Sequence, residues 1–387
     1  MYEKKYVFSQ LTSLLNRNKF NYIVSKYKGD RYVKSFTCWN QLLVMMFGQL
    51  SNRVSLRDLT TTVGVHWKKA YHLGFGKRIT KSNLSKANGS RDYKIFEEFA
   101  YYMIAEARSK RITDIFKLDG NVYAFDSTTI DLCLSVFWWA KFRKTKGGIK
   151  VHTLYDIETQ IPTFIHITTA SVHDMNAMDE IPYEPGSYYI FDRGYNDFER
   201  LHTIHKTKSF FIIRAKSNVR IRNAKWKRRL LKNVKSDCIG YFSGYTSQKL
   251  FPEKIRKVIY WDQDQNREFI FLTNATHLTS LQVADLYKNR WSIELFFKWL
   301  KQHLKIKKFW GTTENAVRIQ IYSAIIAYCL VAIMQHDMKL EFSTYEILQI
   351  LNMSLTDTEP LQDLFDKTKF YNVNELNGSC EPLLFKF

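Results

Sequence analysis

The feature that most constrains the fold of this chain is a change of hydrophobic period near residue 118. Before it, apolar residues recur three and four apart in Phe8–Leu15, Trp39–Leu50 and Tyr93–Ile104, which predicts helices throughout residues 1–115. After it, apolar residues fall into short runs and alternating segments, as in strands. The expected strands are Val122–Phe125, Ile149–Asp156, Ile161–Ala170, Ser187–Phe191 and Phe210–Arg214, with helices at Met175–Ile181 and Asn196–Lys206. This order predicts a mixed α/β domain behind a helical N-terminal region.

A basic segment with a different pattern follows. Residues 215–258 hold 13 Lys or Arg against two acids, and strand-like runs continue to Thr273. We therefore expect residues 215–275 to be a basic, mostly β insertion. A long helix is expected from Ser280 to about Lys308, then an apolar helix near 318–335. Because 387 residues are too many for one ordinary core, the predicted parts are 1–115, 116–214, 215–275, 276–338 and a helical tail, 339–387.

The charge of the chain indicates the class of its partner. It carries 58 Lys and Arg against 37 Asp and Glu, a net charge of +21, which favours a polyanion such as nucleic acid. Five cysteines without a Cys-x-x-Cys pair favour a reducing compartment. The most apolar stretch, Ile321 to Met334, has 14 residues, fewer than the roughly 20 that a membrane span needs. We expect it to be a buried helix in a soluble, cytoplasmic protein.

Two short helices in the N-terminal region suit a helix-turn-helix. Residues 51–55 read as a turn with a helix cap, followed by a helix from Leu56, and residues 80–88 read as a second short helix. The polar face of the second helix would carry Lys81, Asn83, Lys86 and Arg91. The alternative is an ordinary solvated face in a helical bundle.

Two acids follow apolar runs that read as buried strands. Asp126 comes directly after Tyr123-Ala124-Phe125, and Asp192 directly after Tyr188-Tyr189-Ile190-Phe191. Because α/β folds place ligands at the carboxyl ends of strands, both acids are candidates for a site. The alternatives are a helix N-cap or a local ion pair, such as Asp192 with Arg193.

A third acid lies in a stripe of cations on the predicted long helix. At 100° per residue, the members of this stripe fall within about 40° of one line. They are Tyr287, Arg290, Glu294, Lys298, Lys301 and Lys305. Phe296, Trp299 and Leu300 occupy the opposite side, which predicts that this side faces a core. The alternative is a solvated stripe held by pairs four residues apart.

Together the three acids predict a carboxylate cluster. Ionised carboxylates about 4 Å apart repel by roughly 4 kcal/mol at an effective dielectric of 20, so the cluster needs a compensating cation. Ligand sets made only of oxygen prefer Mg²⁺ or Mn²⁺ to zinc. Two such ions can activate water or a 3′-hydroxyl and stabilise the leaving oxygen of a phosphodiester.

These motifs carry a resemblance to a known family. The chain resembles bacterial DDE transposases of the IS-four insertion-sequence group, which have an RNase H-like catalytic domain. The resemblance rests on Asp126-Ser127-Thr128, on Asp192-Arg193-Gly194-Tyr195 and on the Tyr-x2-Arg-x3-Glu-x6-Lys spacing around Glu294. It covers most of the chain. It implies that residues 116–214 and 276–338 form one RNase H-like domain interrupted by the insertion, with a helical DNA-binding domain at 1–115.

The resemblance also implies a reaction and its participants. The reaction is cut-and-paste transposition, in which terminal inverted repeats are cleaved, a hairpin forms and reopens, and the freed 3′-ends join target DNA. Asp126 would bridge two Mg²⁺ or Mn²⁺ ions, with Asp192 and Glu294 on one ion each. Tyr287, Arg290 and Lys301 would hold phosphates, and a homodimer would hold two ends. We further expect Arg193, Lys298 and Lys305 to contact DNA.

Some residues allow two interpretations. A hairpin step needs an aromatic ring that stacks on an extruded base. Phe269 falls at the corresponding place, with Trp261 and Trp226 as alternates, but the favoured interpretation of each is a plain core aromatic.

Other residues near the predicted acids are also ambiguous. His152 and His173-Asp174 are expected to be structural, although Asp174 follows a strand and could approach the ions. Trp138-Trp139 and the basic run that follows would either track a DNA backbone or pack in the core. The rival functions are an RNase H-like nuclease or resolvase, and an inactive DNA-binding remnant of a transposase.

Overall fold

The computed structural model describes residues 5–65, 67–76, 79–111, 113, 115–143, 146–303, 306 and 308–366. The chain divides into two compact units, one formed by Met1–Ala107 with Lys301–Phe387 and the other by Arg108–Leu300. The five-part division expected from the sequence does not coincide with these units and stays a prediction.

The first unit is helical, as the period of the N-terminal region predicts. Its helices in the described residues are α1 (Val7–Thr12), α2 (Arg17–Lys26), α3 (Cys38–Leu50), α4 (Leu56–Val65), α5 (Trp67–Ala70), α6 (Lys81–Ser90), most of α7 (Lys94–Lys110), α12 (Glu314–Asp337) and α13 (Thr344–Ser354).

Helix α12 forms the centre of this unit. Within the part of the chain that the structure describes, it is the one helix whose length and composition would allow it to cross a membrane, but 94% of its most apolar 18-residue window is buried. It packs against α3, α6 and α13. The prediction of a buried apolar helix is therefore confirmed.

The two short helices of the N-terminal region form and pack together as α4 and α6. The Ser55 hydroxyl accepts the N–H of Asp58, so the predicted cap is present, and the Thr80 hydroxyl caps the second helix by accepting the N–H of Asn83. The predicted polar face of α6 is exposed at Lys81, Asn83 and Lys86.

Arg91 does not share this exposed face. Its guanidinium donates to the carbonyls of Phe36 and Thr37 and to the Gln41 side chain at 2.8 Å, and the residue is buried. The prediction that Arg91 belongs to the polar face of the second helix is wrong, because its guanidinium is used to satisfy backbone carbonyls around the start of α3.

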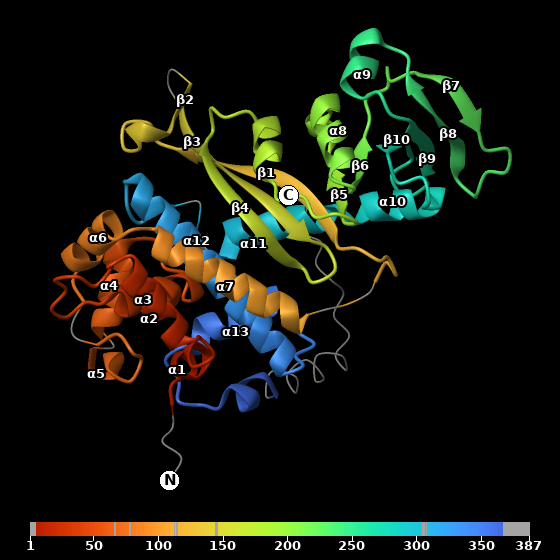
Figure 1. The fold of residues 1–387 in the computed structure, drawn as a ribbon. Helices are drawn as coiled ribbons and strands as arrows, with labels where there is room; N and C mark the ends of the chain where they lie inside the picture. The colour runs from red at the N-terminus through yellow and green to blue at the C-terminus, as the bar shows by residue number, and fades with distance from the viewer. Residues whose placement is uncertain are drawn as a thin grey trace. The chain divides into compact units, whose positions relative to one another are not determined.

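The second unit is built on one large mixed sheet. Within the described residues ten strands pair in the order β2-β3-β1-β5-β6-β10-β9-β8-β7, with β4 also on β3. Strands β3 and β4 are antiparallel neighbours, β3 is antiparallel to β1, and β5 and β6 run parallel to β1. Figure 1 shows β5 and β6 between the long strands and the set β7–β10.

The elements of the first half of this sheet are β1 (Val122–Leu132), η1 (Trp138–Ala140), β2 (Lys141–Arg143), β3 (Lys146–Asp156), β4 (Ile161–Thr169), η2 (Asp174–Glu180), β5 (Tyr188–Phe191), η3 (Arg193–Tyr195), α8 (Phe198–Lys206) and β6 (Phe210–Arg214).

The predicted mixed α/β order of this region is confirmed, with three differences. Strand β1 is longer than expected because β3 pairs with it from Tyr123 to Leu132. The helix expected at 175–181 is a 3-10 helix, and the short strand β2 was not expected. Alternation of apolar and polar residues indicates which face of a strand is buried. It does not indicate how far pairing with a neighbouring strand extends that strand.

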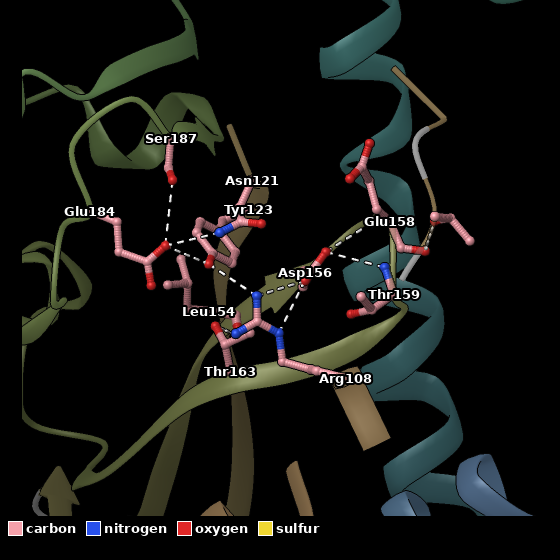
Figure 2. Close-up of polar contacts among 11 residues, drawn as sticks. Arg108, Asn121, Tyr123, Leu154, Asp156, Glu158, Thr159, Thr163, Glu184 and Ser187 are labelled. Atoms are coloured by element: carbon pink, nitrogen blue, oxygen red, sulfur yellow. Dashed lines mark hydrogen bonds and ion pairs between the residues drawn. The ribbon is translucent and has the colours of Figure 1, made fainter. Parts of the chain in front are cut away.

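A polar network surrounds the start of β1, around Tyr123 (Figure 2). Arg108 donates to Asp156 at 2.9 Å and to the Tyr123 hydroxyl at 3.1 Å, and this hydroxyl donates to Glu184 at 2.8 Å. The Glu184 carboxylate also accepts from Asn121. These contacts tie β1 to β3 and to the loop before β5, which fixes the neighbours of β1.

The basic segment continues the sheet instead of standing apart from it. Its elements are β7 (Ile221–Trp226), β8 (Val234–Phe242), α9 (Tyr245–Leu250), β9 (Ile255–Asp262) and β10 (Arg267–Thr273), and β10 pairs antiparallel with β6. A buried ion pair joins β8 to β9: Arg256 donates to Asp237 at 2.7 and 2.9 Å, and both side chains are 0% exposed. Ser280 also donates to Asp237, which attaches the following helix to these strands.

The long helix expected from Ser280 is two helices. Helix α10 (Ser280–Asn289) ends before Arg290, and α11 (Trp291–His303) begins after it. At the junction the N–H of Arg290 donates to the carbonyl of Tyr287, and the N–H of Ile293 to the carbonyl of Arg290, which are three-residue bonds of a tightened turn. The predicted core face is confirmed, since Phe296, Trp299 and Leu300 are buried.

Candidate active site

Asp126 and Asp192 occupy equivalent positions on neighbouring parallel strands. Strands β1 and β5 pair in register up to Phe125 opposite Phe191, and each acid is the next residue along its strand. The two phenylalanines form an edge-to-face pair in the core, so the chain leaves the apolar interior at both acids together. The expectation that Asp126 ends its strand is wrong, since β1 continues to Leu132, but Asp126 does follow the last residue that pairs with β5.

The junction of α10 and α11 supplies the third acid and a cation. Arg290 donates to Asp126 at 3.0 Å and to Glu294 through its other terminal nitrogen. The Tyr287 hydroxyl donates to Asp192 at 3.0 Å. All three predicted acids are therefore connected through two side chains of one helical junction.

The surroundings of Asp126 oppose its ionisation. Burial raises the pKa of the Asp126 carboxyl above its ordinary value, and the charges of Glu294 and Asp192 add to this effect. The Ser127 N–H and the Arg290 guanidinium act in the opposite direction without cancelling it. Asp126 is thus a carboxylate that needs nearby positive charge.

The surroundings of Asp192 shift its pKa in the opposite direction from that of Asp126. Burial alone would raise the pKa of Asp192, but the Arg193 N–H, the Tyr287 hydroxyl and the charges of Arg290 and Arg214 together lower it. Burial, with the adjacent Asp192 charge, raises the pKa of Tyr287 to about 12. The Tyr287 hydroxyl therefore keeps its proton near neutral pH and holds Asp192 in one orientation.

The donor set fits a divalent cation that prefers oxygen. Asp126 lies close enough to Asp192 and Glu294 for their charges to affect it, and the three side chains offer only carboxylate oxygens, which is the chemistry of Mg²⁺ or Mn²⁺ sites. Within the described residues no group of three or more His, Cys, Asp or Glu side chains converges closely enough to hold a metal as it stands. The Arg290 guanidinium lies between Asp126 and Glu294 and supplies the positive charge there. For these two carboxylates to share an ion, Arg290 has to move.

A cavity of about 930 Å³ opens beside the acids. Asp192, Arg290 and Glu294 contribute to its wall, together with side chains of β9, β10 and α10. Its other cations are Arg214, Arg267 and Lys288. The cavity thus combines a carboxylate cluster with cations that suit phosphate oxygens.

Phe269 lies in this cavity wall but is only 5% exposed. The guanidinium of Arg267 lies 4.3 Å from the centre of its ring, and that of Arg214 lies 5.1 Å away. The ring also packs against Tyr287. Of the two alternates, Trp226 on β7 is 64% exposed. The Lys235 ammonium lies over the ring of Trp261. Stacking of any of these rings on a base stays a prediction.

The remaining predicted site residues differ in their surroundings. Arg193 and Lys298 are exposed, and Lys301 is half-buried. Lys305 lies outside the described residues. The predicted phosphate contacts of Tyr287, Arg290 and these residues stay predictions, and Tyr287 and Arg290 donate to carboxylates in this structure.

One residue of the site, Arg214, was not anticipated. Arg214 ends β6, the strand beside β5, and its charge lowers the pKa of Asp192. Its position at a strand end next to the strand of Asp192 is the signal that could have identified it. Asp174, whose approach to the site was one of two interpretations of the sequence, is held next to Asp126. Ser127 donates to Asp174 at 2.7 Å, and Lys150 lies 3.2 Å from the same carboxylate.

Comparison with known proteins assigns most of the chain, between residues 117 and 330, to one family. Residues 117–330 match the family described as "Transposase DDE domain", and residues 3–76 match a domain of unknown function (DUF4372). A protein of Sinorhizobium fredii (strain NBRC 101917 / NGR234), named as a transposase (y4zB), is 36% identical over 214 residues, which are 54% of this chain and 59% of that protein. The chain thus spans about three fifths of the length of that relative.

Two further similarities complete the comparison. "Probable transposase for insertion sequence element IS5377" of Geobacillus stearothermophilus is 27% identical over 253 residues, which are 65% of this chain and 67% of that protein. A solved structure, a cryo-EM piggyBac transposase synaptic complex with hairpin DNA, superposes with a TM-score of 0.49 and 12% identity over 96% of this chain and 85% of that one.

Proposed function

The chain belongs to the transposase DDE domain family, and we propose that it catalyses DNA strand cleavage and strand transfer for an insertion sequence. One observation carries the proposal: Asp126 and Asp192 follow an in-register pair of parallel strands, and a single helical junction connects both to Glu294. The proposed substrates are the terminal inverted repeats of the element and target DNA, joined by a cut-and-paste route.

The order of strands supports an RNase H-like catalytic core. Strands β4, β3 and β1 form an antiparallel set, and β5 and β6 add in parallel on the other side of β1. We propose that these five strands are the RNase H-like part and that β7–β10 are the insertion. The insertion adds its cations to the cavity through Arg267 on β10.

We propose that Asp126, Asp192 and Glu294 hold two Mg²⁺ or Mn²⁺ ions. When bound, such ions lower the pKa of water and stabilise charge on phosphodiester oxygens. The protein contributes orientation and charge. Tyr287 fixes the Asp192 carboxylate, and Arg290 balances Asp126 and Glu294 until ions and substrate bring charges of their own.

DNA binding extends beyond the cavity in this proposal. Arg214, Arg267 and Lys288 face the phosphates near the cleaved bond, with the exposed Arg193 and Lys298 on the adjoining backbone. Lys81, Asn83 and Lys86 on α6 read the terminal repeat. Lys301 and Lys305 also contact DNA, and two copies of the chain hold two ends in the bacterial cytoplasm.

Replacement of the acids tests the proposal. Asp126→Asn, Asp192→Asn and Glu294→Gln should each abolish Mg²⁺-dependent cleavage of a labelled duplex that carries the inverted repeat read from the genomic flanks. Binding of the same duplex should survive, because the substitutions leave the cationic surface unchanged. Asp179→Asn is the matched control, since that carboxylate forms an exposed pair with Arg200.

Two outcomes would contradict the proposal. If the variants lose DNA binding together with cleavage, the acids are structural. If wild-type protein releases only nicked products and never joined ones, the chain is an RNase H-like nuclease or resolvase. An inactive remnant would show binding that chelators leave unchanged and no cleavage at all.

A further inference from the structure

Strands β1 and β3 continue well past the acids. The pairing of β1 with β5 stops at Phe125, whereas its pairing with β3 continues to Leu132 opposite Gly147. At about 3.3 Å per residue, Leu132 lies about 20 Å beyond Asp126 along the strand. We call residues 133–143 and 146–148, the part of this segment that the structure describes, the hairpin tip. Figure 1 shows this end of β3, with β2 beside it, projecting away from β5 and β6.

The charged side chains of the hairpin tip are all positive. Residues 133–148 contain no acid and four Lys or Arg. Lys141, Arg143 and Lys146 are exposed in the structure. Such a run of cations attracts a polyanion and repels a second copy of itself.

The hairpin tip also leaves aromatic surface exposed. Trp138 is 78% exposed, although its neighbour Phe137 is buried and Ala140 is fully buried. The half-buried Trp139 packs edge-to-face on Phe137, so the two neighbouring tryptophans differ in exposure. Arg143 lies 5.1 Å from the centre of the partly exposed Phe142 ring. An exposed Trp among cations is the combination that nucleic-acid surfaces use for stacking and phosphate contact.

We propose that the hairpin tip binds the DNA duplex about six base pairs from the cleaved bond. The spacing follows from the 20 Å reach of β1 and the rise of about 3.4 Å per base pair. Lys141, Arg143 and Lys146 contact phosphates, and Trp138 lies against sugars or base edges. This inference rests on the proposed function, because Asp126 marks the cleaved bond.

Photocrosslinking tests the position of the tip. The photoreactive residue p-benzoyl-phenylalanine replaces Trp138 in the full chain that also carries Asp126→Asn, and the probe is the inverted-repeat duplex. The expected adduct maps about six base pairs from the cleavage site. The same replacement of Met353, which is 84% exposed on α13, is the control for random collision.

The result separates the two proposals. A crosslink to DNA without any cleavage by wild-type protein would support the tip contact and contradict the proposed function. Cleavage by wild-type protein, with no adduct at position 138 or an adduct only to a second protein copy, would overturn the inference about the tip.

Salt dependence provides a second measurement. The triple variant Lys141→Gln, Arg143→Gln and Lys146→Gln should reduce the slope of log affinity against log salt by up to about 2.7, at about 0.9 for each phosphate contact. The matched control replaces three other exposed lysines, Lys206, Lys208 and Lys339, with Gln. An equal loss in both triple variants would show that net charge is responsible, and would overturn the proposal.

Discussion

At the scale of single residues, the arrangement around Arg290 explains how three acids can lie together in a folded chain. The Arg290 side chain is 12% exposed and donates to Asp126 and Glu294 at once. A buried carboxylate without a partner charge would be costly, and the raised pKa of Asp126 shows that the compensation is incomplete. The site therefore favours binding of additional cations.

Substitution of Arg290 tests whether the carboxylates need its positive charge. Arg290→Gln should destabilise the protein by about 2 kcal/mol without metal, since charged hydrogen bonds of the carboxylates are lost. Added Mg²⁺ should raise the melting temperature of the variant more than that of wild type, because Arg290 no longer competes for the carboxylates. Melting curves with and without Mg²⁺ measure this. Lys288→Gln, an exposed cation of the same cavity, is the control, and equal Mg²⁺ shifts in all proteins would contradict the prediction.

His152 has the structural role that the sequence predicts, and the structure adds its burial and its hydrogen-bond partner. Its ring is fully buried, its Nε2 lies 3.0 Å from the Thr168 hydroxyl, and burial lowers its pKa to about 4. The unfolded chain binds this proton below about pH 6.5, whereas the folded chain binds it only below about 4. The stabilisation is therefore complete above pH 6.5 and is lost as the pH falls to 4.

The expected loss for His152 is about 3 kcal/mol, from about 1.4 kcal/mol per pKa unit. Urea unfolding between pH 7 and 4 measures it, with His152→Gln as the variant that lacks this titration. His173→Gln, at an exposed neighbouring histidine, should behave like wild type. A pH slope that is the same in wild type and His152→Gln would disprove the assignment.

At the scale of elements, the basic segment shows how a sheet is extended. Strand β10 pairs with β6, and β9 and β8 follow as neighbours. The buried pair of Arg256 and Asp237 joins β8 to β9 with hydrogen bonds, and it lowers the pKa of Asp237 to about 2 despite burial. This pair specifies the register of the two strands, since a slip of one residue would leave both charges buried without partners.

Asp237→Asn should therefore cost about 3–5 kcal/mol of unfolding free energy, because Arg256 would remain buried without its counter-ion. Urea denaturation measures the change. Asp264→Asn removes an exposed pair with Lys288 and should change stability by less than about 1 kcal/mol. Similar effects of the two substitutions would show that the buried pair does not stabilise these strands.

At the scale of the whole molecule, the net charge of +21 is the property that acts on charged partners over long distances. If six to ten phosphates are contacted, affinity for a duplex should fall by about 10³- to 10⁵-fold between 50 and 200 mM salt. Titration of a labelled duplex at several salt concentrations measures the slope. A nearly flat response would remove electrostatics as the main source of DNA affinity.

The sequence alone was sufficient for most of the elements and for the selection of candidate side chains. Period and turn residues correctly predicted strands β1 and β3–β6, the buried α12 and the helix cap of α4. These features are local, because hydrophobic period and capping depend on residues within a few positions of each other. The candidate acids could be selected for the same reason, since each follows an apolar run or lies in a stripe of cations.

Only the tertiary structure decided which distant residues meet. It placed Asp126 beside Asp192 in register, inserted Arg290 between carboxylates and split the expected long helix there. It also buried Arg91 and left Trp138 exposed beside a packed Trp139. Pairing and register depend on contacts between segments far apart in the chain, so a pattern that reports only which side of a segment is buried does not contain them.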